Sequence, residues 1–209
     1  SKGELDYDDF IEKINSKTKL IAITHMSNVT GSITNFENIK IKANKFNVPI
    51  LIDGCQYVPH KKLDIRELDP DFYVFSAHKL YGPSGLGILF MKDDWIEKLG
   101  PYQGGGSMIK NVESDSSTYL EDNHKFEAGT PPIAQVIGLS SSIEFINEIG
   151  IENIYSYENE LTNYAYDKIR EHNDIKIYGD FKNQTSIISF NIDGIHFNDL
   201  AMFLDKKNI

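Results

Sequence analysis

Two short polar segments follow apolar runs and contain residue types that suit covalent catalysis. The first segment is Asp53-Gly54-Cys55-Gln56, after the run Pro49-Ile50-Leu51-Ile52. The second is Ser76-Ala77-His78-Lys79, after the run Phe72-Tyr73-Val74-Phe75. Both runs are predicted to be buried strands. Because an open α/β sheet binds ligands outside the carboxyl ends of its strands, we expect the acid and the lysine to share one site.

An acid and a lysine at one site are what pyridoxal phosphate (PLP) chemistry requires. The lysine amine forms a Schiff base with the cofactor aldehyde, and the acid keeps the pyridine nitrogen protonated. A single lysine is more often a solvated surface group, but Gly82, Pro83 and Gly85 place Lys79 in a tight turn. Partial desolvation there favours the neutral amine. Asp53 also suits the simpler role of capping a turn.

Other polar residues of these strand-end loops are candidates for holding such a cofactor. Ser76 and His78 are able to donate hydrogen bonds to a phosphate, although turn formation and a satisfied histidine are the simpler explanations. Gln56 is near enough in sequence to Asp53 to reach the cofactor's phenolic oxygen. Asn28 is the candidate from a third strand-end loop, residues 25–31, where a plain turn asparagine is the alternative.

The single cysteine and a glycine run give weaker signals. Cys55 is a candidate nucleophile because it is the single cysteine of the sequence, but its place beside Asp53 favours a packing role. The run Gly104-Gly105-Gly106-Ser107 could cradle a phosphate through backbone amides. No metal site is predicted.

Composition limits the class of protein. The 209 residues are 40% hydrophobic and 25% charged, which is typical of a globular chain with a sizeable core. A net charge of −10 argues against a nucleic-acid binder. No apolar run is long enough to span a membrane, and the N-terminal residues do not form a signal peptide pattern. One cysteine favours a reducing compartment, so we expect a cytoplasmic protein.

The elements that must position these residues alternate along the chain. Strands are predicted near residues 20–23, 50–53, 72–75 and 86–91, with a helix opened by a capping box at Thr34-Asn35-Phe36-Glu37. This order predicts an α/β fold with a mainly parallel sheet. Residues 100–131 show few periodic apolar positions, so we expect a long functional loop there.

The second half is predicted to be mostly helical at first. A helix follows Pro131-Pro132 and ends at Gly150, and a second helix follows it. The second helix is expected to turn these residues inward: Ile151, Ile154, Leu161, Tyr164, Ala165 and Ile169. Strands near 175–178 and 186–192 and a last helix from about 197 complete the pattern. We therefore expect a large domain over residues 1–150 and the start of a smaller α+β domain over 151–209.

These segments together resemble the class V aminotransferase superfamily, and within it the SufS-type (group II) cysteine desulfurases. The resemblance covers essentially the whole chain. Its specific motifs are Ser76-Ala77-His78-Lys79-Leu80-Tyr81-Gly82-Pro83 and Phe126-Glu127-Ala128-Gly129-Thr130-Pro131, supported by Asp53-Gly54-Cys55-Gln56, by residues 25–31 and by Gly104-Gly105-Gly106-Ser107-Met108-Ile109.

The resemblance implies a type I PLP-dependent transferase fold, a homodimer, L-cysteine as substrate and a sulfur-acceptor protein in iron–sulfur cluster assembly. Lys79 would be the Schiff-base lysine and would take the substrate's α-proton. The other residues would hold the cofactor: Asp53 at the pyridine nitrogen, Gln56 and Asn28 at the phenolic oxygen, Ser76 and His78 at the phosphate, and Thr130 at the phosphate in the neighbouring subunit. Asn28 would also lie near the substrate.

The family's ring-stacking histidine and first phosphate loop would lie upstream of this chain, and its catalytic cysteine loop would lie downstream. The resemblance is thus to an internal portion, which we expect to be inactive by itself. Two alternatives remain at this stage. One is a selenocysteine lyase or another class V PLP lyase, and the other is an inactive dimerisation or scaffold-binding fragment.

Overall fold

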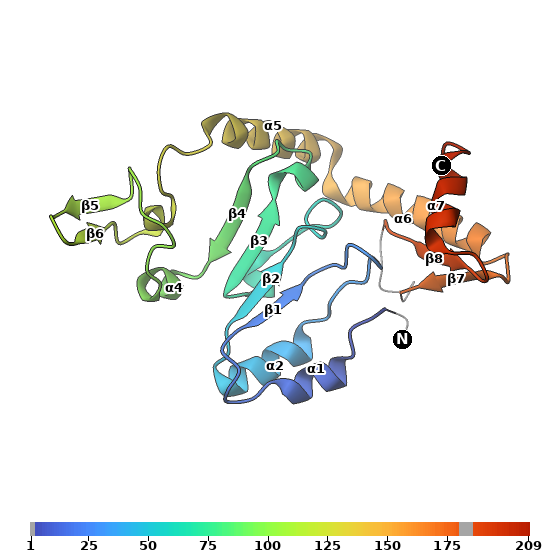
Figure 1. Ribbon diagram of the computed structural model, residues 1–209, viewed down its shortest axis with the longest axis horizontal. Helices are drawn as coiled ribbons and strands as arrows, with labels where there is room; N and C mark the ends of the chain where they lie inside the picture. The colour runs from blue at the N-terminus through green and yellow to red at the C-terminus, as the bar shows by residue number, and fades with distance from the viewer. Residues whose placement is uncertain (1–2, 180–185) are drawn as a thin grey trace.

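The computed structural model describes residues 3–179 and 186–209, and its centre is a four-stranded sheet (Figure 1). The strands lie in the order β1-β2-β3-β4. Their bounds are Ile21–Thr24, Ile50–Asp53, Phe72–Ser76 and Gly87–Met91. Strands β1, β2 and β3 are parallel, whereas β4 returns antiparallel to β3. The predicted α/β fold with a mainly parallel sheet is confirmed.

Short helices precede β1 or connect the parallel strands, and they cover the sheet. They are α1 (Tyr7–Lys13), α2 (Glu37–Phe46) and α3 (Ile65–Leu68). Figure 1 shows α1 and α2 side by side next to β1 and β2. Helix α2 turns Ile39 and Ala43 inward, where they are fully buried and pack in one cluster with Ile52 and Tyr73. The main core therefore lies between this helical layer and the first three strands.

The prediction that a capping box starts this helix is wrong in detail. Helix α2 begins at Glu37 after an N-cap residue, Phe36, whose side chain makes no capping bond. The Thr34 hydroxyl instead donates to the Thr24 carbonyl at 2.7 Å, because that residue is used to tie its loop to β1. The Asn35 side chain replaces it and accepts from the Glu37 amide at 2.9 Å.

The segment between β4 and the long helices has more structure than predicted. It contains α4 (Asp93–Lys98), a hairpin of β5 (Ile109–Val112) and β6 (Ser117–Tyr119), and the 3-10 helix η2 (Asn123–Phe126). Most hairpin residues are exposed. No apolar periodicity marks such a hairpin, so the expectation of a long loop without elements was wrong.

Two long helices lead to a second small sheet. They are α5 (Ile133–Ile149) and α6 (Ile151–Ile169), separated by Gly150. The sheet pairs β7 (Ile175–Tyr178) with β8 (Ser189–Ile192) in antiparallel fashion, and α7 (Phe197–Asp205) follows. Figure 1 shows α5 running across the β3–β4 side of the large sheet and α6 continuing toward β7, β8 and α7.

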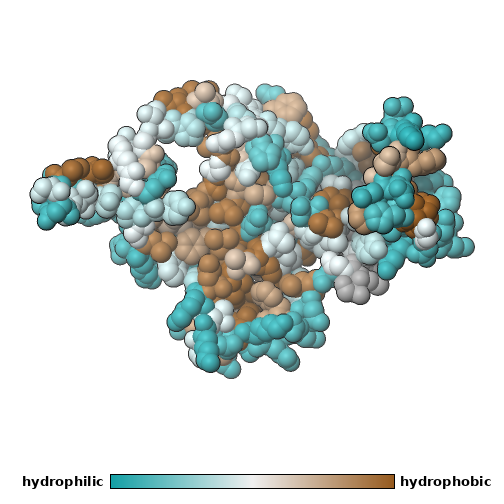
Figure 2. Space-filling view, viewed as in Figure 1, coloured by the Kyte–Doolittle hydropathy of each residue, from teal (hydrophilic) through white to brown (hydrophobic). Residues whose placement is uncertain are grey.

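Several apolar side chains are exposed on these elements. On α6, Leu161 and Tyr164 are 49% and 66% exposed, so the prediction that they point inward is wrong for this chain. On α5, Ile137 is 63% exposed and only Leu139 and Ile146 are buried. Figure 2 shows apolar surface over the middle of the large sheet as well. The helical spacing of apolar residues thus identified α5 and α6, but it did not show which of their faces are buried in this chain.

Among the described residues, no helix combines the length and the apolar character needed to cross a membrane.

Candidate functional site

The parallel register brings three strand ends to one edge of the sheet. Thr24 of β1 lies beside Asp53 of β2, and Asp53 lies beside Val74 of β3. The hydrogen bonds continue past the strand ends: the His25 amide donates to the Asp53 carbonyl at 2.7 Å, and the Gly54 amide donates to the Val74 carbonyl at 2.8 Å. The loops that carry the predicted site residues therefore leave the sheet from neighbouring positions.

Lys79 lies in a short, well-braced turn. The turn is the 3-10 helix η1 (Ala77–Leu80), and the Ala77 amide donates to the Leu86 carbonyl at 3.0 Å across its base. Helix α5 packs against the same turn, since the Ser142 hydroxyl donates to the Tyr81 carbonyl at 3.0 Å. The chain reverses at Tyr81 with a left-handed φ of 58°. The position of Lys79 is consequently fixed from two sides.

Lys79 and Gln56 meet directly. The Lys79 Nζ atom donates to the Gln56 Oε1 atom at 3.2 Å, and both side chains are partly buried. The two residues lie on loops after β3 and β2, so the contact joins the two segments that the sequence singles out. An amine with a fixed polar neighbour at a sheet edge is suited to react with a carbonyl ligand.

Asp53 is exposed at the end of β2, on the same edge as Lys79. Its Oδ1 atom accepts a hydrogen bond from the Cys55 amide at 2.9 Å, which is the turn-capping role named as the simpler alternative. In the described part of the chain, its Oδ2 atom has no hydrogen-bond partner. A carboxylate oxygen is therefore available to a ligand while the turn stays capped.

Ser76 and His78 lie on either side of Ala77 near the lysine, but neither is tied to a charged group in the described structure. The Ser76 hydroxyl lies 3.6 Å from the Cys55 sulfur atom, and Cys55 is partly buried. His78 is exposed. Both residues are close in sequence to Lys79 and are positioned by the same turn.

Asn28 is exposed on the loop after β1. The loop is compact, because the Ser27 hydroxyl accepts from the Val29 amide at 3.2 Å and from the Thr30 amide at 3.1 Å. A β-bridge between Met26 and Ile33 closes it at its base. The structure places Asn28 on the third strand-end loop but brings it into no described contact with Lys79.

Thr130 lies apart from the lysine, on the loop before α5, and is exposed. This loop packs on the glycine run, where the Gly129 amide donates to the Gly106 carbonyl at 2.8 Å. A Cβ atom on Gly105 would lie 3.1 Å from the Ala128 Cβ atom, so the glycine permits this close approach. Two motifs that are distant in sequence therefore form one surface beside Thr130.

A buried aromatic cluster supports the site from below, and the sequence reasoning missed it. The His25 ring stacks on Tyr57 at 3.5 Å, and His25 Nδ1 lies 3.0 Å from the Tyr73 hydroxyl oxygen. Burial lowers the pKa of His25 to about 4, helped by the positive charge of Lys61. Burial also raises the pKa of Tyr73 far above its usual range. His25 is thus a neutral packing residue that braces the loop carrying Gln56.

A second missed pair joins the Gln56 loop to α6. His60 Nδ1 lies 2.9 Å from one carboxylate oxygen of Glu158 and 3.1 Å from the other. Gln56 Nε2 lies 3.3 Å from His60 Nε2. The spacing of Gln56 and His60 was visible in the sequence, but nothing there indicated a partner 98 residues away.

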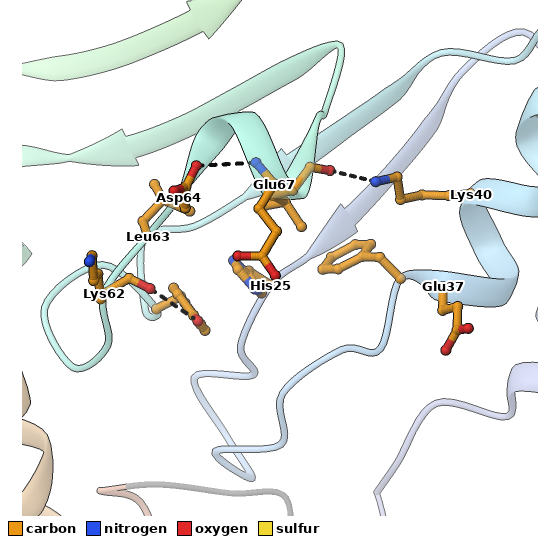
Figure 3. Close-up of a pocket in the computed structure, with 10 residues that line it drawn as sticks. His25, Glu37, Lys40, Lys62, Leu63, Asp64 and Glu67 are labelled. Atoms are coloured by element: carbon orange, nitrogen blue, oxygen red, sulfur yellow. Dashed lines mark hydrogen bonds between the residues drawn. The ribbon is translucent and has the colours of Figure 1, made fainter.

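A cavity of about 630 Å³ is lined by residues of α2 and α3 and of the loops that carry His25 and Tyr57 (Figure 3). Its wall includes His25, Tyr57 and Glu67 but not Lys79. Hydrogen bonds join residues of the wall: Lys40 Nζ donates to the Leu68 carbonyl at 2.9 Å, the Tyr57 hydroxyl donates to the Lys62 carbonyl at 3.4 Å, and Asp64 accepts from the Glu67 amide at 3.1 Å. Since Lys79, Asp53 and Gln56 do not line this cavity, we place the candidate site at Lys79 and not in the cavity.

Comparisons with known proteins show the family of the chain. The family Aminotransferase class-V matches residues 1–209. A cysteine desulfurase of Wigglesworthia glossinidia brevipalpis is 45% identical over 210 residues, covering 99% of this chain and 51% of that protein. One of Haloferax volcanii is 38% identical over 208 residues, covering 99% of this chain and 49% of that protein.

A solved structure shows the same fold. The crystal structure of the cysteine desulfurase CsdA from Escherichia coli matches with a TM-score of 0.88 and 34% identity, covering 96% of this chain and 50% of that chain. The chain spans about half the length of the curated relatives it matches.

Proposed function

This chain belongs to the class-V aminotransferase family, and on that basis we propose that the protein is a PLP-dependent cysteine desulfurase. It would convert L-cysteine to L-alanine and retain the sulfur as an enzyme-bound persulfide for iron–sulfur cluster assembly. The observation that carries the proposal is the contact of Lys79 Nζ with Gln56 Oε1 at the sheet edge that also presents Asp53. The names of the similar proteins support the choice of reaction.

The groups present at the sheet edge fit PLP. An amine, a carboxylate with a free oxygen and a carboxamide are the three side-chain types that its aldehyde, pyridine nitrogen and phenolic oxygen would take. Lys79, Asp53 and Gln56 would fill these roles. Ser76 and His78 would bind the phosphate, Asn28 the phenolic oxygen and the substrate, and Thr130 the phosphate of a cofactor in a second subunit.

The chain's own groups would bind, orient and move a proton. Lys79 Nζ would be the covalent attachment point and would later take the proton from Cα of L-cysteine. Asp53 Oδ2 would hold a proton on the ring nitrogen by its negative charge, while Oδ1 keeps the turn capped. Bound PLP would supply the electron sink that makes the Cα proton acidic.

We further propose a homodimer, a sulfur-acceptor protein as partner and a cytoplasmic location. The exposed position of Thr130, away from Lys79 on the loop before α5, suits a contact with a second subunit. The single cysteine suits a reducing compartment. A domain boundary near Gly150 is supported by the separate hydrogen bonding of the β7–β8 sheet.

Borohydride labelling tests the proposal. The protein made from its complete reading frame is incubated with PLP, reduced with borohydride, digested and mapped by mass spectrometry. The label is expected on Lys79, and Lys79→Ala should abolish it. Label on another lysine, or none on a folded protein, would contradict the proposal. Comparing alanine release from L-cysteine and from L-selenocysteine separates a desulfurase from a selenocysteine lyase.

A further inference from the structure

A continuous set of polar contacts runs from the lysine to α6. Lys79 Nζ donates to Gln56 Oε1 at 3.2 Å, and Gln56 Nε2 lies 3.3 Å from His60 Nε2. His60 Nδ1 lies 2.9 Å from Glu158 Oε2. The Ser186 hydroxyl donates to the same carboxylate oxygen at 2.7 Å. The side chains of Gln56 and His60 thus connect the proposed covalent attachment point, Lys79, with Glu158 on α6.

Donor and acceptor chemistry links the orientations of these groups when the His60 ring carries one proton. An ionised carboxylate only accepts, so in the ring form of His60 that carries one proton, that proton lies on Nδ1, facing Glu158. His60 Nε2 is then an acceptor and requires an N–H from Gln56. The amide of Gln56 therefore turns its NH₂ group toward His60 and its oxygen toward Lys79, as observed.

We propose that Glu158 is a positioning residue that acts through His60 to fix the orientation of the Gln56 amide. This inference rests on the proposed role of Lys79. With the amide fixed, Lys79 Nζ always faces an acceptor, and the second N–H of Gln56 is left to donate to an acidic oxygen of a ligand. If the His60 proton moved to Nε2, the amide would rotate and present its NH₂ group to Lys79 instead.

The surroundings of the pair suit this role. The side chains of His60 and Glu158 are only 14% and 21% exposed. Water therefore competes little for these hydrogen bonds, and each bond biases the next more strongly than at the surface. The hydrogen bond that one ring nitrogen of a histidine makes commonly sets which nitrogen carries the proton.

A simple anchoring role would have different consequences. If the His60–Glu158 pair only held α6 on the Gln56 loop, its loss would lower stability but leave the chemistry at Lys79 unchanged. Two readouts separate the roles. One is the position of the His60 proton, read from long-range ¹H–¹⁵N spectra of the cofactor-free protein. The other is the midpoint of the pH titration of the visible band that PLP gives when bound to Lys79.

The experiment compares Glu158→Gln with Glu160→Gln, an exposed glutamate on the same helix, in the protein made from its complete reading frame. In wild type the His60 proton is expected on Nδ1. A carboxamide at position 158 both donates and accepts, so Glu158→Gln should give a mixture of the two tautomers. The titration midpoint should shift by about half a pH unit or more. Glu160→Gln should change neither.

Three results would overturn the inference. They are a wild-type His60 proton on Nε2, an unchanged tautomer in a folded Glu158→Gln protein, and a changed tautomer with an unmoved titration midpoint. The first of these results is measured on the wild-type protein, so it can be obtained even if the Glu158→Gln protein does not fold. Absence of the visible band in wild type would overturn the proposed function instead, and the cofactor-free spectra would still decide on the His60–Glu158 arrangement.

Discussion

The side chain of Tyr73 occupies the space that Gly54 leaves open. A Cβ atom on Gly54 would lie 2.0 Å from the Tyr73 hydroxyl oxygen and 2.1 Å from its Cζ atom. Tyr73 is 1% exposed and its hydroxyl contacts His25, so the ring has no room to move aside. The glycine directly after Asp53 is therefore required by the core beneath the site.

Gly54→Ala is expected to lower the free energy of unfolding by about 1–3 kcal/mol or more, because the added methyl group overpacks a buried ring. Chemical denaturation followed by circular dichroism measures the loss. Gly87→Ala is the matched control, since its Cβ would meet only the Phe75 carbonyl oxygen at 4.0 Å. Equal stability of the two variants would contradict the explanation.

Asp53→Asn separates the two roles of Asp53. The amide oxygen still caps the turn at Cys55, so stability should change little, but the negative charge is lost. We expect kcat/KM for alanine release to fall by well over tenfold, which corresponds to more than about 1.4 kcal/mol of transition-state stabilisation. Asp115→Ala, at an exposed site in the β5–β6 hairpin, serves as the control. Activity within tenfold of wild type would argue against a role at the ring nitrogen.

Cys55→Ala should retain persulfide formation within a few-fold. The Cys55 sulfur atom lies against Ser76 beside the capped turn, and the backbone amide of Cys55 is what binds Asp53. Labelling of persulfide after addition of L-cysteine measures the outcome. Complete loss of the persulfide, with PLP still bound, would make Cys55 the sulfur acceptor.

The buried His25 makes stability depend on pH. Its folded pKa of about 4 lies below the ordinary histidine value of 6.5, so the unfolded chain binds more protons between these values. Its contribution is fully present above pH 6.5 and is lost as pH falls toward 4, by on the order of 2–3 kcal/mol. Denaturation at pH 4.5 and 7 should show this loss in wild type. His25→Gln should show a smaller difference between the two pH values, and an unchanged difference would assign the effect to other groups.

The sequence predicted the large sheet, and with it that Asp53 and Lys79 follow neighbouring strand ends, for a clear physical reason. Strands β2 and β3 are short apolar runs, and a parallel sheet brings their carboxyl ends together. Asp53 and Lys79 could therefore be placed at one edge without knowledge of other contacts. The contact between Lys79 and Gln56 follows from the same register.

Other parts of the site could not be predicted because they depend on long-range packing. Glu158 carries no local mark that points to His60. Histidine is often catalytic, so the sequence alone does not reveal the role of His25. Its burial and its stacking on Tyr57 show that it is a packing residue. The β5–β6 hairpin was missed because it is exposed and lacks the alternation of apolar and polar residues by which a strand is predicted.

The separation along the chain of the contacts around Lys79 has a consequence for the order in which they form. The turn of Lys79 is closed by the adjacent strands β3 and β4, and the partner of Lys79, Gln56, lies 23 residues away. The His60–Glu158 contact must close a loop between residues that lie 98 positions apart. Since longer loops cost more entropy to close, the lysine turn should form early in folding and during synthesis. The Gln56 amide would acquire its fixed orientation only later, when α6 has been synthesised and docks.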